Sequence, residues 1–233
     1  GCVRSATGWA CLVRVRALSL DLLAELTRGL FLTVPGGVAV LIVGVDRVAV
    51  EADLVAGRLA CPGCGVGLRP WGQARERELR CRAGTRRVTP RRAICAGCGV
   101  THVLLAEDGL TRRRDAVVDI GVALTAKAAG SGHRPIAVRL GVPAATVRGW
   151  LRRFDANAER VRAHFTRWAA ALDPTLGPVM PAGSGFADAV AAVGAAAAAA
   201  VRRLGPRPAW HVASVLTGGG LLSNTSCPWV APG

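Results

Sequence analysis

Two Cys-x-x-Cys pairs constrain this chain of 233 residues more than any other feature of its sequence. Cys61-Pro-Gly-Cys64 and Cys95-Ala-Gly-Cys98 are separated by thirty residues, so each pair can sit at the tip of its own β-hairpin. Four thiolates in two paired knuckles suit a closed, tetrahedral Zn²⁺ site of the structural kind. The sequence therefore predicts a zinc ribbon at residues 58–110, with Zn²⁺ as its cofactor.

The other side chains that could join this site have ordinary alternatives. Cys81 and His102 are candidates for a fifth ligand, but a small apolar strand residue and a polar strand residue would look the same. Cys2, Cys11 and Cys227 are scattered without a pattern, so the cysteine usage favours a reducing cytosol with zinc over a disulfide framework. A thioredoxin-like redox site would have one such pair at a helix start, not two.

The charge of the chain is concentrated in its middle. The formal net charge is +15, and residues 58–167 hold 22 basic and 8 acidic residues. Residues 1–57 carry equal numbers of each sign, and residues 168–233 have a net charge of +1. A polyanion-binding domain concentrates its cations in this way, whereas a generic solvated surface does not.

Arginine is dense between the two cysteine pairs. Residues 75–82 and 86–94 alternate polar and apolar side chains around the turn Ala83-Gly84, which predicts the two strands of a hairpin. Such a hairpin could lie along phosphates, with Arg75, Arg77, Arg86 and Arg87 as the expected contacts. Trp71, nearby, is expected in the core rather than as a base-stacking platform.

A helix-turn-helix pattern begins at His133. Apolar residues recur at the inward positions of a helix over 134–140 and of a second helix over 144–168, and Gly141 between them supplies a left-handed turn. Two short helices packed steeply around a tight turn require this spacing. The alternative is an ordinary helical pair in which Gly-Val-Pro is merely a turn.

A third helix precedes this pair and completes the domain. Thr111 is a plausible N-cap for a helix over 113–129, which predicts a three-helix, helix-turn-helix DNA-binding domain at 111–170. Arg148 would read a guanine edge, and Thr146 would touch a phosphate or a thymine methyl. For any single arginine the alternative is simple solvation. The residues of this domain expected to contact DNA are Arg134, Ala144, Ala145, Thr146, Arg148, Arg152 and Arg153.

The C-terminal third divides into a linker and a helix. Residues 171–185 are rich in proline and glycine and indicate a linker. Residues 186–233 are predicted to be an alanine-rich helix, ending at Leu204, and then a loop-rich tail. The helix could mediate self-association or form a loosely packed cap. The predicted fold is thus α+β and mostly helical: a small β zinc ribbon, a three-helix domain and an Ala-rich C-terminal helix.

Residues 1–57 are assigned to no domain. Residues 17–30 look helical, 38–45 look like a short strand, and 47–58 could form an amphipathic helix. The chain has no early methionine, so we expect its first 35–40 residues to be a fragment or a mis-assigned start. The apolar stretch Gly29–Val45 is at the short limit for a membrane span, but Pro-Gly-Gly divides it, and no membrane role is expected.

These motifs together resemble a known family. The run Cys-Pro-Gly-Cys-Gly, then Leu-Arg-Pro-Trp-Gly, an Arg-rich hairpin, Arg-Arg-Ala-Ile-Cys-Ala-Gly-Cys-Gly and a helix-turn-helix resemble the N-terminal region of some bacterial insertion-sequence transposases. More closely, the chain is similar to an uncharacterised group of helix-turn-helix proteins from high-GC bacteria. The resemblance covers residues 40–170 and implies DNA binding.

In those transposases a catalytic domain with three metal-binding carboxylates follows, and here the sequence departs from the family. After residue 154 the only acidic residues are Asp155, Glu159, Asp173 and Asp188, in a segment too short and too alanine-rich for that domain. The sequence therefore predicts a protein that is not an enzyme. No small-molecule substrate is evident.

Three functional interpretations remain. The first is a zinc-containing protein that binds double-stranded DNA in the cytoplasm, associated with the nucleoid, as a transcriptional regulator or as an accessory or relic of a mobile element; it could act as a homodimer. The second is the DNA-recognition subunit of a transposase with a separate catalytic partner. The third is a zinc-ribbon module that binds RNA or protein.

Overall fold

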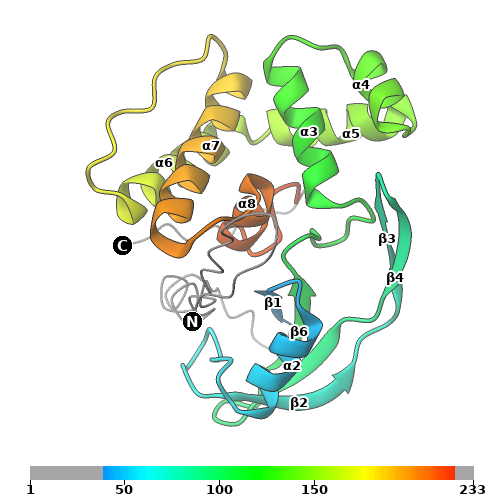
Figure 1. Cartoon of the computed structure of the whole chain (residues 1–233), viewed down its shortest axis with the longest axis vertical. Coiled ribbons are helices and arrows are strands. Elements are labelled where there is room, and N and C mark those ends of the chain that lie inside the picture. Colours follow the sequence, from blue (N-terminus) through cyan, green and yellow to red (C-terminus); the bar gives the residue numbers. More distant parts are fainter. Residues whose placement is uncertain (1–38, 224–233) are drawn as a thin grey trace, which may run out of the picture.

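The computed structural model describes residues 39–223 of the chain. Over this range the fold is α+β, as predicted, with seven helices and six strands. Figure 1 shows most of the helices gathered at one end of the molecule, the main sheet with α2 at the other end, and α8 between them. The expectations for residues 1–38, including the helix at 17–30 and most of the apolar stretch, lie outside the described residues.

The main sheet has four strands in the order β1-β6-β5-β2. β1 (Ala39–Val43) runs parallel to β6 (Thr101–Ala106), and β5 (Arg91–Cys95) is antiparallel both to β6 and to β2 (Leu68–Gln73). A parallel pair needs a crossover connection, and here the segment between β1 and β6 contains the hairpin and both cysteine pairs.

Helix α2 (Arg47–Val55) packs its inner side against this sheet. Asp46 begins the helix, because its carboxylate accepts hydrogen bonds from the N–H groups of Val48 and Ala49 at 2.9 and 3.2 Å. Val50 and Leu54 are buried in the core of the sheet. The apolar spacing of residues 47–58 therefore predicted a helix at this place, although the helix ends at Val55 and two residues of the apolar pattern, Val48 and Val55, are exposed rather than buried.

Strands β3 (Arg77–Cys81) and β4 (Gly84–Val88) form a separate two-stranded sheet. The prediction of one strand over 86–94 is wrong, because the strand is interrupted at Thr89–Pro90, which separates β4 in the hairpin from β5 in the main sheet. Pro90 has no N–H group to continue a ladder. Figure 1 shows the hairpin rising from the main sheet toward the start of α3.

The hairpin is tied to the helical end by polar contacts. Arg80 forms an ion pair of 2.9 Å with Asp115, and the N–H group of Arg82 donates to the carboxylate of Asp119 at 3.0 Å. These contacts fix the hairpin between the sheet and the helices.

Six helices follow the sheet. They are α3 (Val117–Ala128), α4 (His133–Leu140), α5 (Ala144–Asp155), α6 (Ala158–Leu172), α7 (Gly185–Leu204) and α8 (Ala209–Leu216). Their apolar faces share one core, which includes Ile120, Trp150 and Phe165.

Helix α3 begins later than predicted. Its N-cap position is Ala116, and Thr111 does not cap it, because the Thr111 hydroxyl donates to the carbonyl of Gly219 at 2.9 Å. The side chain of Arg113 donates to the carbonyl of Leu222 at 2.7 Å. Contacts with the chain after α8 thus hold residues 111–113 outside the helix.

The single helix predicted over 144–168 is also wrong, because the structure divides it into α5 and α6. The break lies at Ala156–Asn157, where the side-chain amide of Asn157 donates to the carbonyl of Arg153 at 3.0 Å. The break lets α6 turn back and pack along α7. Asparagine competes for backbone groups in this way and favours helix ends.

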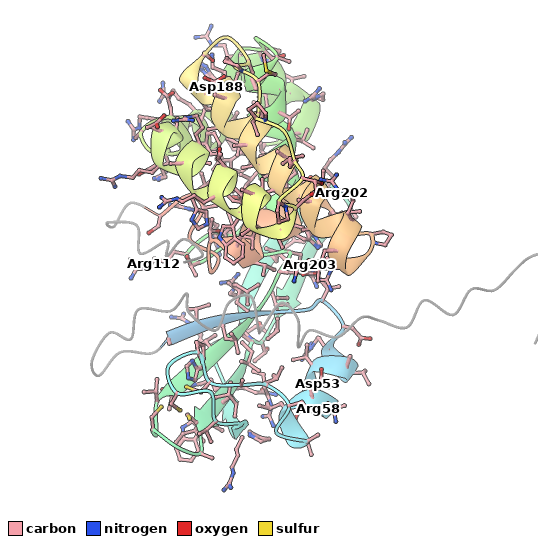
Figure 2. The ribbon with its side chains drawn as sticks, turned by 90° about the vertical axis from the view of Figure 1, so that its left-hand side faces the viewer. Asp53, Arg58, Arg112, Asp188, Arg202 and Arg203 are labelled. Carbon is pink, nitrogen blue, oxygen red and sulfur yellow. The ribbon has the colours of Figure 1, made fainter. Side chains whose placement is uncertain are left out.

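Helix α7 is a core element rather than a loose cap. Its buried face is made mostly of alanines, including Ala189, Ala192, Ala196 and Ala199. Short side chains let α6 approach closely, and α6 fills the interface with large ones such as Trp168. Figure 2 shows Asp188 near one end of α7 and Arg202 and Arg203 at the other.

The segments on either side of α7 are also ordered by contacts. Arg202 holds the linker through an ion pair of 2.6 Å with Asp173. The predicted loop-rich tail is wrong over Ala209–Leu216, which form α8 and bury Val212, Ala213, Ser214 and Leu216. Among the described helices, α7 is the one long and apolar enough to cross a membrane by length and composition, but half of that stretch is buried inside the protein.

Replacing Gly121 by alanine is expected to destabilise the protein by about 2–3 kcal/mol, since a Cβ there would overlap the indole of Trp210 from α8. Gly194→Ala in α7 is the control: a Cβ at that position meets nothing within 4 Å. It should raise stability by about 0.5–1 kcal/mol through helix propensity. Urea unfolding of both variants measures this. Equal stabilities would contradict the packing of α3 on α8.

Candidate metal centre and candidate nucleic-acid surface

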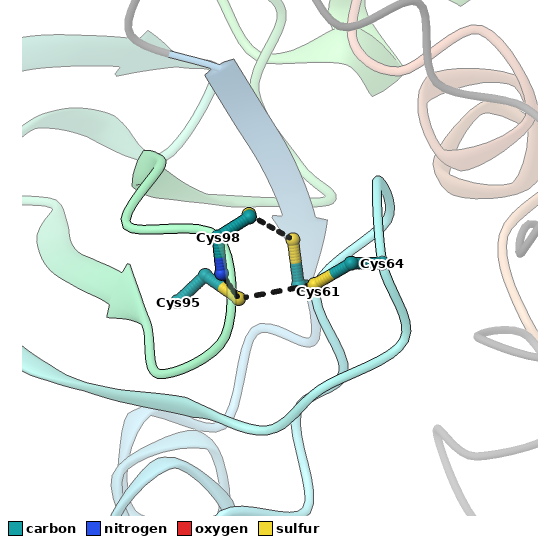
Figure 3. Close-up of side chains that lie close together, drawn as sticks. All are labelled: Cys61, Cys64, Cys95 and Cys98. Atoms are coloured by element: carbon teal, nitrogen blue, oxygen red, sulfur yellow. Dashed lines mark hydrogen bonds between the residues drawn. The ribbon is translucent and has the colours of Figure 1, made fainter.

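The two cysteine pairs meet in space. The Sγ atoms of Cys61, Cys64, Cys95 and Cys98 all lie within 4.8 Å of one another. Figure 3 shows the two pairs facing each other. The Sγ atom of Cys61 is 3.7 Å from that of Cys98, and the Sγ atom of Cys64 is 3.3 Å from that of Cys95. The first pair lies in the loop before β2, and the second lies in the turn between β5 and β6. Spacing alone predicted this meeting of four sulfurs.

The two loops have the same backbone hydrogen bonds. In each, the N–H of the first cysteine donates to the carbonyl five residues later, at 2.8 and 2.9 Å. In each, the carbonyl of the first cysteine accepts from the glycine that follows the second cysteine, at 2.8 and 3.1 Å. Gly65 and Gly99 have φ values of +75° and +72°, a left-handed conformation that glycine adopts without strain. Each loop therefore presents its two sulfurs on one side.

The sulfurs differ in their tendency to ionise. Burial raises the pKa of Cys61 to about 12. Burial also opposes ionisation of Cys95, but the N–H groups of Cys98 and Gly97, at 3.4 and 3.3 Å from its Sγ, help to lower its pKa to about 6. A bound cation would displace the remaining protons.

His102 lies behind Cys61 and is almost completely buried. Its Nε2 is 3.5 Å from the Sγ of Cys61, and its Nδ1 is buried without a partner. Burial lowers the pKa of His102, so its imidazole is neutral at neutral pH. The tautomer with the proton on Nε2 can donate to an ionised Cys61, as residues around metal ligands commonly do. The sequence had offered His102 as a fifth ligand, and the structure places it beside the four cysteines.

The four cysteines could hold a metal ion. Sulfur donors of this number and closeness suit Zn²⁺. Cys81 lies apart from the cluster, on β3, where its Sγ is 3.2 Å from the carbonyl of Gly84. Within residues 39–223, no other group of three or more His, Cys, Asp or Glu side chains has this geometry.

Helices α4 and α5 carry the residues expected to contact DNA. Gly141 between them has φ +67°, the left-handed conformation expected for the turn. Val147, Trp150 and Leu151 are buried, as the pattern requires. The expected contact residues divide by exposure: Arg134, Ala145, Arg148 and Arg152 are exposed, whereas Ala144, Thr146 and Arg153 are half-buried.

The exposed arginines of this surface lack acidic partners. Within the described part of the chain, Arg134, Arg139, Arg148 and Arg152 form no ion pair and no side-chain hydrogen bond. Arg153 differs, because its guanidinium donates to the carbonyl of Gly149 at 3.0 Å. We call the first four residues the α4–α5 basic surface. Its charges are free to meet an anion.

Half of the six arginines at residues 75–88 are matched by carboxylates. Arg80 pairs with Asp115, Arg87 pairs with Glu76 at 3.6 Å, and Arg86 pairs closely with Asp108. Part of the positive charge that the sequence concentrates here is therefore neutralised within the protein.

The four predicted hairpin contacts do not share one face. Arg75 is exposed, and Arg87 is exposed but paired with Glu76. Arg77 and Arg86 lie on the other side, where they line a groove beside α2. Trp71 was expected in the core, and this is wrong, because its side chain is 56% exposed.

The sequence reasoning missed that groove. The signal was present in residues 45–55, where apolar side chains occur on both sides of the predicted helix rather than on one.

Comparison of the chain with protein-family models, with curated proteins and with solved structures finds no match.

Replacing Cys61 by serine is expected to abolish metal binding and to unfold the main sheet, because folding and binding are linked at such sites. Cys81→Ser is the control, since Cys81 lies outside the cluster. Metal analysis of the purified variants and hydrogen exchange across β5 and β6 measure both effects. A folded Cys61→Ser protein with full metal content would contradict the site.

Zinc binding is expected to tighten as pH rises. A thiol must lose its proton before it ligates, so protons compete with the metal. Cys95, with a pKa of about 6, is already ionised at neutral pH, whereas Cys61, with a pKa of about 12, must release a proton. The apparent affinity should therefore increase steadily from about pH 6 to pH 8, with fewer than four protons released per zinc. Competition with a chromophoric chelator measures this, and an affinity independent of pH would contradict it.

Proposed function

We propose that this chain is a zinc-containing, non-enzymatic protein that binds double-stranded DNA with sequence preference. The observation that carries the proposal is the α4–α5 basic surface, whose four exposed arginines have no acidic partner. Two short helices around a left-handed glycine turn are the geometry of a helix-turn-helix, in which the second helix enters the major groove.

In this proposal α5 is the recognition helix. Ala145, Arg148 and Arg152 are its exposed residues toward the proposed groove, and small residues such as Ala144 and Gly149 allow close approach to the bases. Arg148 would donate to a guanine, and Arg152 with Arg134 would contact phosphates. The half-buried Arg153 is assigned to structure, because it bonds to its own helix.

The cysteine site acts as a structural support in this proposal. A zinc ion would close the zinc ribbon, and the ribbon carries the β3–β4 hairpin, which is anchored to α3 through Asp115 and Asp119. Of the four predicted hairpin contacts, Arg75 and Arg87 remain exposed and would add phosphate contacts, although Arg87 also pairs with Glu76. Arg77 and Arg86 are withdrawn from the DNA surface, because they line the groove.

This mode of binding fits a transcriptional regulator or an accessory or relic of a mobile element, acting at the nucleoid. Participation with a separately encoded catalytic partner is compatible with the same surface. The exposure of Trp71 supports a second candidate, a single-stranded RNA binder, because an exposed aromatic ring among arginines can stack on an unpaired base.

Selection of binders from a random duplex library at two salt concentrations tests the proposal. An enriched sequence that survives the higher salt would support a specific DNA reader, and a symmetric motif would indicate a homodimer. No enriched motif, with affinity lost as salt rises, would contradict sequence preference. Competition by structured and single-stranded RNA at matched salt separates the second candidate.

Arg148→Ala is expected to relax sequence preference at one base pair by about 1–3 kcal/mol. Arg203→Ala at the end of α7 removes the same charge from an exposed position outside the α4–α5 basic surface, and it should leave the preference unchanged. Binding isotherms on the selected duplex and its single-base variants measure this. Equal weakening on all sequences would identify Arg148 as a phosphate contact instead.

A further inference from the structure

A groove of about 750 Å³ lies between α2, the base of the β3–β4 hairpin and the end of β6. Its size falls within the range of about 300–1,000 Å³ that is typical of small-molecule sites. It is separate from both the cysteine cluster and the α4–α5 basic surface, since no residue of either lines it.

The walls of the groove are mostly apolar. One wall is the outer side of α2 together with Val45, which lies just before the N-cap residue; Val45, Val48 and Val55 are 48%, 80% and 68% exposed. The opposite wall comes from the hairpin, through Leu79 and Val88. α2 is thus apolar on two sides, one buried against the sheet and one facing the groove. A helix that is apolar on two sides usually packs both sides against other parts of the protein or against a ligand.

The groove also holds a half-buried cation without a counterion, Arg77. Arg77 and Leu79 alternate with outward residues along β3, so both point to the groove side. Among the described residues, the side chain of Arg77 has no ion pair and no hydrogen bond, and its Nε is buried without a partner. Burial lowers the pKa of this guanidinium, but not enough to remove its charge.

The nearby carboxylates are already engaged by other arginines. Asp108 pairs with Arg86, and Glu51 accepts two hydrogen bonds of 2.9 Å from Arg91. Arg77, Arg86 and Arg91 are thus matched by only two carboxylates, those of Asp108 and Glu51, which leaves one positive charge in excess. Arg47, a further lining cation, forms no ion pair within residues 39–223. Burying half of a guanidinium without an anion costs free energy, because the lost hydration is not replaced. A carboxylate can replace it by accepting two parallel hydrogen bonds from the guanidinium N–H groups.

We propose that this groove binds a small amphipathic anion, a carboxylate carried on an unbranched aliphatic chain, with the carboxylate on Arg77 and the chain along Val48, Val55 and Leu79. The apolar walls account for the chain, and the unpaired guanidinium accounts for the carboxylate. The inference does not depend on DNA binding.

Isothermal titration of the full-length, zinc-loaded protein with decanoate tests this proposal, below the concentration at which decanoate aggregates. Decanol, which lacks the charge, and acetate, which lacks the chain, are the matched ligands. Decanoate should bind at least about tenfold more tightly than either, because the two parts of the site act together. No binding of decanoate, or equal binding of decanol, would overturn the proposal.

Variants locate the site. Arg77→Gln should weaken decanoate binding about tenfold, and Arg77→Lys should lie between, since it keeps the charge but loses the fork. Arg82→Gln on the same hairpin removes an exposed charge outside the groove and should leave affinity unchanged. Val48→Ser should weaken the binding of decanoate without changing the binding of acetate. Zinc content and melting temperature verify folding, and an unchanged affinity in Arg77→Gln would overturn the assignment.

Discussion

The meeting of four cysteine sulfurs is the interaction on which the sheet end of the molecule depends. Cys61 and Cys95 are buried within the core that also contains Leu54, Leu68 and Leu104, so the sulfur cluster and the apolar core are continuous. That core has nine buried residues, and a core of this size contributes little stability by itself. Ligation of a metal by the four thiolates would supply the missing stabilisation and fix the strands on either side.

The distribution of ion pairs changes the meaning of the positive charge. In the hairpin, Arg80 and Arg86 face the carboxylates of Asp115 and Asp108, and these two contacts dock the hairpin onto its neighbours. Arg87 pairs with Glu76, which directly precedes β3. The four arginines of the α4–α5 basic surface face solvent without such partners. Arginine-rich segments of the sequence therefore correspond to two kinds of structure: a network of ion pairs within the protein, and an exposed surface without such pairs. Only the second kind is suited to a polyanion.

Local patterns predicted the elements better than their ends. The knuckle spacing predicted the sulfur cluster, and apolar periodicity predicted α2, α4 and α7 nearly to their termini. The predicted helix ends were wrong where a segment distant in the sequence makes contact. Thr111 donates to Gly219 instead of capping α3, and the break at Asn157 lets α6 pack back along α7. Residues 209–216 appeared as tail, because eight residues carry too little periodicity to reveal a helix that tertiary contacts stabilise.

The sequence by itself determined the candidate metal ligands and the turn at Gly141, because both depend on residue type at short spacing. A sulfur donor and a left-handed backbone are chemical properties that need no distant partner. The tertiary structure alone decided which arginines are neutralised, that Trp71 is exposed, and that Arg77 lies unpaired in an apolar groove. These properties depend on which side chains approach through space, and the strength of a charge is set by its neighbours and its burial rather than by its place in the chain.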